Sequence, residues 1–221
     1  MTDFMQFFSD SDPTNVSTSI KLMLLLTVLS LAPAILILMT SFTRIVIVLS
    51  FVRTALATQQ MPPNQVLVGL ALFLTFFIMA PTFQEVNKEA LTPLFNEEIS
   101  LDEAYENASV PIKQFMSKHT RQKDLDLFLK YNDAERPATV EEIPLTMLVP
   151  AYALSEIKTA FQMGFMIFIP FLVIDMIVAS VLMSMGMMML PPVMISLPFK
   201  ILLFILVDGW YLVIQSLLQS Y

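Results

Sequence analysis

The sequence predicts an all-α, polytopic membrane protein made of two helical hairpins and a small extracytoplasmic helical insert. Of its 221 residues, 56% are hydrophobic and only 14% are charged, whereas about 25% of the residues of a soluble domain are charged. Four runs contain no ionisable side chain, and a run of about 18 or more such residues is a candidate membrane helix. These runs are residues 22–43, 66–83, 159–174 and 176–199.

The uncharged runs divide the chain into four parts. Residues 1–20 form a polar N-terminal tail, and residues 21–83 form the first apolar helical pair. Residues 84–146 form a polar insert that holds most of the net negative charge and two amphipathic segments, 101–119 and 124–131. Residues 147–221 form the second apolar helical pair, with a methionine-rich loop. We expect the insert to be a small helical subdomain outside the bilayer.

Prolines indicate where the apolar segments break, because proline lacks the amide donor and clashes with the preceding helical turn. Pro33 predicts a kink in the first run, which is too long for one simple span. Pro62 and Pro63 predict the turn of the first hairpin, with Asn64 as the N-cap of the next helix. Pro191 and Pro192 predict the turn of the second hairpin, between arms at 176–190 and 193–221.

The positions of the basic residues predict the orientation of a multi-pass protein in the membrane. Arg44 and Arg53 flank the link between the first two helices. Short cytoplasmic loops carry an excess of Lys and Arg, so we expect this link in the cytoplasm. Two crossings then place the tail and the insert outside. The turn at Pro191 and Pro192 lies inside, and residue 221 lies outside.

The composition argues against an enzyme and against a cofactor, metal or nucleic-acid site. His119 is the single histidine, and we expect it to be a solvated surface residue of the insert. One histidine without cysteine cannot supply a typical zinc site. The four glycines are isolated, so they form no phosphate-binding loop. A net charge of −7 is the opposite of the basic footprint that nucleic acid needs.

Three charged residues stand out in the second apolar half: Asp175, Lys200 and Asp208. Each costs about 2.5–3.5 kcal/mol at the centre of a bilayer unless it is paired or hydrated. Fifteen residues separate Asp175 from Leu190, whereas eight separate Pro192 from Lys200, so a pair within one chain needs offset helices. A pair between subunits is equally open. Other interpretations are ions that extend to the membrane interface, or a proton relay.

Methionines are concentrated just before the second proline pair. Met187, Met188 and Met189 follow Met183 and Met185 within seven residues. Three consecutive methionines either point around most of a helix or form a short loop. Methionine is unbranched and polarizable, so it adapts to irregular partners. A ring of such loops could seal a pore against ions and yield to a polypeptide. The alternative is ordinary core packing in a methionine-rich protein.

Several sequence blocks resemble those of the FliP/SctR family, in its flagellar branch. They lie in the family's order along nearly the whole chain. The blocks are residues 39–46, 62–77, 150–165, 169–175, 187–192, 197–200 and 207–210.

The resemblance implies a homo-oligomeric, pentameric ring in the bacterial inner membrane, at the centre of the flagellar basal body. The ring would assemble with FliQ and FliR as a helical complex, with FlhA and FlhB below it. It would form the export gate for unfolded flagellar subunits and be needed for flagellum biogenesis. The family's methionine loop lines the closed gate, which here corresponds to Met187, Met188 and Met189. The family's complex can also sit higher than a four-span membrane model suggests.

Two other functions are compatible with the residues alone. A secondary transporter or proton channel for a small solute would use Asp175, Lys200 and Asp208 as its relay. A passive membrane scaffold would tolerate free replacement of the three methionines.

Overall fold

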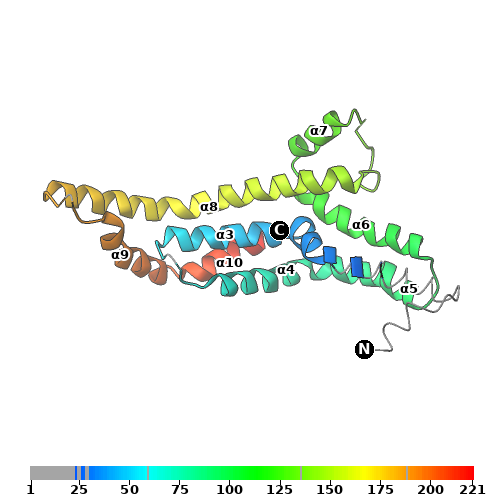
Figure 1. Ribbon diagram of the computed structural model, residues 1–221, viewed down its shortest axis with the longest axis horizontal. Helices are drawn as coiled ribbons and strands as arrows, with labels where there is room; N and C mark the ends of the chain where they lie inside the picture. Colours follow the sequence, from blue (N-terminus) through cyan, green and yellow to red (C-terminus); the bar gives the residue numbers. More distant parts are fainter. Residues whose placement is uncertain (1–22, 24–25, 28–29, 59, 135, 188) are drawn as a thin grey trace. The chain divides into compact units, whose positions relative to one another are not determined.

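The computed structural model describes residues 23, 26–27, 30–58, 60–134, 136–187 and 189–221, and in these residues the secondary structure is helical without strands (Figure 1). The predicted all-α fold class is therefore confirmed. The chain divides into two units, Met1–Ile37 and Leu38–Tyr221. The tail expected at residues 1–20 lies outside the described residues.

The first interruption of the apolar region lies later than the sequence suggested. Helical residues continue from Ser30 through Pro33 to Met39, and the helix stops at Thr40 and Ser41. The next helix, α3, spans Phe42–Ala55. The first run is thus interrupted at Thr40 and Ser41, whereas the helix continues through Pro33.

Helix α3 packs along the 40-residue helix α8 (Leu145–Ser184), and the two lie side by side in Figure 1. The buried face of α3 repeats at helical spacing with Ile45, Val48, Leu49 and Val52. Gly164 of α8 allows the close approach. A Cβ atom built at Gly164 would lie 2.4 Å from Cδ2 of the Phe51 ring.

Helix α4 (Asn64–Val86) begins directly after the first proline pair. Pro63 occupies the N-cap position and Asn64 is the first helical residue, one position from the prediction. A π-helical turn (Asn87–Leu91) and a short helix α5 (Thr92–Phe95) extend α4. The apolar helix therefore continues beyond residue 83, into the segment expected to be the polar insert.

The insert contains two helices that pack on the beginning of α8. Helix α6 spans Leu101–His119, the residues predicted for it, and α7 spans Gln122–Tyr131. At the start of α6 the Ser100 hydroxyl accepts a hydrogen bond from the Glu103 amide, and the Glu103 carboxylate accepts one from the Ser100 amide. Met116 of α6 packs with Tyr152 of α8 in a buried cluster.

The second apolar pair has one break more than predicted. Helix α9 (Pro192–Leu206) starts at the second proline pair, as expected. The expected continuous arm at 193–221 is wrong, because α9 ends and α10 (Gly209–Gln219) begins after a bend of 62°. Asp208 takes a left-handed conformation at φ 51°, and Gly209 leaves room for the Phe204 ring, 2.3 Å from where a Cβ would stand.

Among the residues that the structure describes, two helical segments, Asn64–Phe95 and Leu145–Ser184, are long and apolar enough to cross a membrane. The number rises to four if each of two interrupted helix pairs counts as one span. These pairs are Ser30–Met39 with Phe42–Ala55, and Pro192–Leu206 with Gly209–Gln219. At 1.5 Å per residue α8 is about 60 Å long, roughly twice the thickness of a hydrocarbon core. Only 11% of its most apolar window is buried within the chain. Lipid or other protein chains must cover the rest.

We predict that Gly164→Ala destabilises the packing of α3 on α8, because the new methyl group overlaps the base of the Phe51 side chain. Overpacking of this kind costs about 1–3 kcal/mol. Gly69→Ala on α4 is the matched control, since no atom lies within 4 Å of its Cβ position, and it should be neutral or stabilising by up to about 1 kcal/mol. Thermal unfolding of the full chain in detergent measures both. Equal stability of the two variants would contradict the close α3–α8 contact.

Candidate functional site

The methionine-rich segment forms the loop between α8 and α9. The loop begins with a glycine cap: Gly186 has φ 72°, its amide donates to Met183 O (3.1 Å), and the Met187 amide donates to Leu182 O (3.0 Å). Of the two conformations that the sequence left open, the described residues show the loop. Met188 lies outside the described residues.

The described methionines of this loop point away from the chain's own core. Met189 is 98% exposed, and Met183, Met185 and Met187 are exposed as well. Ordinary packing within this chain therefore does not account for these four residues. Pro191 and Pro192 follow directly. Pro192 lies in the first turn of α9, where a backbone N–H has no hydrogen-bond acceptor within the helix, so proline loses none.

The structure brings Asp175 and Lys200 together within one chain. Lys200 Nζ lies 2.6 Å from Asp175 Oδ2, and the Ser196 hydroxyl donates to Asp175 Oδ1 at 2.5 Å. The Lys200 side chain is 2% exposed and that of Asp175 is 28% exposed. The unequal arms expected from the sequence are not found. Helix α8 already ends at Ser184, so the distances from Asp175 and from Lys200 to the loop are similar.

Asp208 does not join this pair. It is exposed at the break between α9 and α10. Both carboxylate oxygens of Asp175 are engaged by Lys200 and Ser196. The three conspicuous ions of the second half thus do not form one contiguous chain of contacts.

A second buried ion pair, Arg44 with Glu156, links α3 to α8 and was missed in the sequence. Arg44 Nε donates to Glu156 Oε2 at 2.9 Å, and Arg44 Nη2 pairs with Glu156 Oε1 in a bidentate arrangement. Both side chains are buried. A signal was available, because Arg44 lies at the edge of the apolar run 22–43 and Glu156 shortly before the run 159–174.

The pairing of Arg44 weakens one argument for the membrane orientation. Arg44 lies in the first turn of α3 and Arg53 in its last turn, so the two residues sit at opposite ends of this helix. Only Arg53 adjoins the link to α4, and the charge of Arg44 is balanced by Glu156. The predicted cytoplasmic position of the link therefore rests on Arg53 and remains a prediction.

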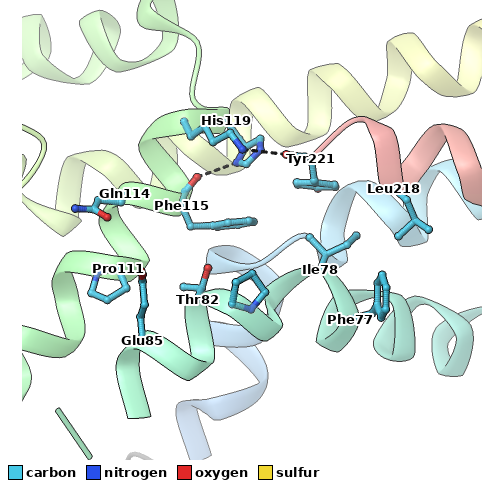
Figure 2. Close-up of a pocket in the computed structure, with 12 residues that line it drawn as sticks. Phe77, Ile78, Thr82, Glu85, Pro111, Gln114, Phe115, His119, Leu218 and Tyr221 are labelled. Atoms are coloured by element: carbon cyan, nitrogen blue, oxygen red, sulfur yellow. Dashed lines mark hydrogen bonds between the residues drawn. The ribbon is translucent and has the colours of Figure 1, made fainter. Parts of the chain in front are cut away.

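His119 is half-buried at the junction of the insert with the end of the chain, so the expectation of a solvated histidine is wrong. The centroid of its ring lies 4.9 Å from the ring centroid of Phe115 and 4.9 Å from that of Tyr221. Its Nδ1 is 2.8 Å from Phe115 O. Figure 2 shows His119, Phe115 and Tyr221 together. Burial lowers the pKa of His119 below its ordinary value, which favours the neutral ring.

A cavity of about 480 Å³ adjoins these rings. Figure 2 shows it lined by α4, α6 and the residues around Tyr221, with Glu85 and Gln114 among its polar groups. Within the described part of the chain, no group of three or more His, Asp or Glu side chains could hold a metal ion.

Nearby, a smaller polar cluster fixes the start of α7 to α8. Asp124 Oδ2 accepts hydrogen bonds from Arg121 Nε (2.8 Å) and from the Ser155 hydroxyl (2.6 Å). The Arg121 amide donates to the same hydroxyl at 3.0 Å. The Asp124 carboxylate thus links α7 to Ser155 of α8.

Comparison with known proteins identifies the family. The model of the FliP family matches residues 25–217. A protein of Bacillus subtilis strain 168 named flagellar biosynthetic protein FliP is 75% identical over 221 residues, covering all of both chains. Proteins of the same name from Aquifex aeolicus strain VF5 (52% identical; 94% of this chain, 87% of the relative) and Caulobacter vibrioides (55%; 91% and 76%) are also similar. The chain therefore belongs to the FliP family.

Proposed function

We propose that this chain is a membrane component of the flagellar export apparatus, and that several copies form its protein-conducting gate for unfolded flagellar subunits. The similar proteins carry the name flagellar biosynthetic protein. The long apolar helices are those of a membrane protein. We place it in the inner membrane, at the basal body.

The exposed methionine loop is the observation that carries the proposal. Met187 and Met189 lie in the turn of the α8–α9 hairpin, and their side chains are exposed rather than packed in the core of this chain. Flexible thioether side chains repack around irregular partners. Loops from several copies that meet around an axis would exclude ions, and they would separate for an extended polypeptide.

The uncovered apolar surface of α8 supports an oligomer. The most apolar window of α8 has few buried residues within its own chain, so this part of the helix needs neighbours. We propose that copies of this chain supply part of that cover and that the family's partners FliQ and FliR supply more, with FlhA and FlhB adjacent. The family resemblance makes a pentamer the expected ring. Energy for transport would come from outside this chain.

The Asp175–Lys200 pair is proposed to be a register element of the hairpin rather than a proton relay. Lys200 is almost fully buried and bound to Asp175, while Asp208 is exposed at another break. A relay through all three would need them in contact. The same geometry makes a small-solute transporter the weaker proposal.

We predict that replacing Met187, Met188 and Met189 by alanine increases ion leakage several-fold through the assembled complex, since alanine is too short to close the axis. Conductance across the membrane of cells that overproduce the complex measures the effect. Met166→Ala is the control, because Met166 is an exposed methionine on α8 away from the loop. Unchanged conductance in the triple variant would remove the sealing role and favour the passive scaffold.

We predict that Asp175→Leu alone disrupts the oligomer, because it leaves the buried Lys200 ammonium without its partner, at a cost of about 3–5 kcal/mol. The double variant Asp175→Leu with Lys200→Met should assemble, since replacing both ions by apolar groups is often neutral. Native gels follow assembly, and secreted hook protein from a complemented deletion strain follows export. Normal assembly of the double variant without export would contradict the structural role and favour the relay.

A further inference from the structure

Ser220 and Tyr221, which follow α10, touch three other helices at once. The Tyr221 hydroxyl donates to Glu156 Oε2 of α8 at 2.5 Å. Its ring is stacked on Phe115 of α6, with centroids 6.0 Å apart and planes inclined by 11°. The Arg44 guanidinium carbon of α3 lies 3.9 Å from the centre of the same ring. These contacts join residues 65 to 177 positions apart in the chain.

The same two residues complete the hydrogen bonding of the buried ion pair. Glu156 accepts from Nε and Nη2 of Arg44, which leaves Nη1 without a carboxylate oxygen. Nη1 instead donates to Ser220 O (2.9 Å) and Ser220 Oγ (3.0 Å). A buried charged group that lacks its partners costs more than an ordinary lost hydrogen bond. The pair therefore depends on Ser220 and Tyr221 as well as on its own two members.

Helix α10 needs this attachment. It has 11 residues, and helices shorter than about 12–15 residues are marginal on their own. Its buried residues are Gly209, Val213 and Leu217, whereas Tyr211 and Leu212 are exposed. The break at Asp208 separates it from the regular hydrogen bonding of α9.

We infer that Ser220 and Tyr221 form a clasp that holds the α9–α10 arm on the junction of α3, α6 and α8 by completing the buried Arg44–Glu156 pair. Lys118 reinforces the clasp from α6, with Nζ 3.1 Å from Tyr221 O. The arm is thus held at two places. Lys200 of α9 binds Asp175 of α8, and the clasp holds the residues after α10. Tyr221 acts as a positioning residue for this part of the fold, and the inference does not depend on the gate.

Hydrogen exchange of the α10 amides in the full chain in detergent tests the clasp. Tyr221→Leu removes the hydroxyl and the ring, and we expect α10 exchange to rise at least about tenfold. Tyr221→Phe keeps the ring and removes the hydroxyl, so the rise should be smaller. Tyr131→Phe is the control, because Tyr131 is 88% exposed, and it should leave α10 unchanged. The single tryptophan, Trp210, lies edge-on to Phe204 at 5.4 Å and reports release of α10 by its fluorescence.

A double-mutant cycle separates a clasp acting through the ion pair from simple ring packing. In the background Arg44→Met with Glu156→Met, the Tyr221 hydroxyl has lost its carboxylate acceptor. The further change Tyr221→Phe should then alter α10 exchange by less than about twofold, in contrast to its effect in the unmodified chain. An equal effect in both backgrounds would overturn the inference. So would unchanged α10 exchange in Tyr221→Leu.

Discussion

The apolar surface of α8 is the constraint on which the rest of the structure depends. The helix is about twice as long as a bilayer core is thick, and only 11% of its most apolar window is buried within its own chain. Helix α3 and the insert cover its first part, and α9 covers a stretch near its end. The remaining apolar surface explains why this chain is expected to function among neighbours, in lipid and in an oligomer.

Two pairs of charged residues in the described apolar helices join neighbouring helices. Arg44 with Glu156 joins α3 to α8, and Asp175 with Lys200 joins α8 to α9. Apolar helices gain little from mutual contact inside lipid, so polar contacts between helices specify which faces meet. Hydroxyl groups bind both pairs: those of Tyr221 and Ser220 in the first case, and that of Ser196 in the second. Both pairs thus link two helices, and neither contacts the exposed Asp208.

Composition, uncharged runs and the two proline pairs predict the helical class and the hairpin turn beside the methionines, and the amphipathic pattern of residues 101–119 predicts α6. The break at Asp208 was not predicted, because an apolar pattern does not show that Asp208 takes a left-handed conformation or that Gly209 lies against the Phe204 ring. The family blocks include residues of both ion pairs. Pairing of Arg44 with Glu156 still could not be deduced, since 112 residues separate them and Arg44 was interpreted only as an indicator of orientation. The helical run through Pro33 shows that a proline alone does not locate a break.

An electron-microscopy map of the assembled complex, purified from the native membrane, would show where the methionine loops lie. We predict several copies of this chain around one axis, with the loop that contains Met187 and Met189 closing the centre. A map in which that loop faces lipid, away from any axis, would contradict it.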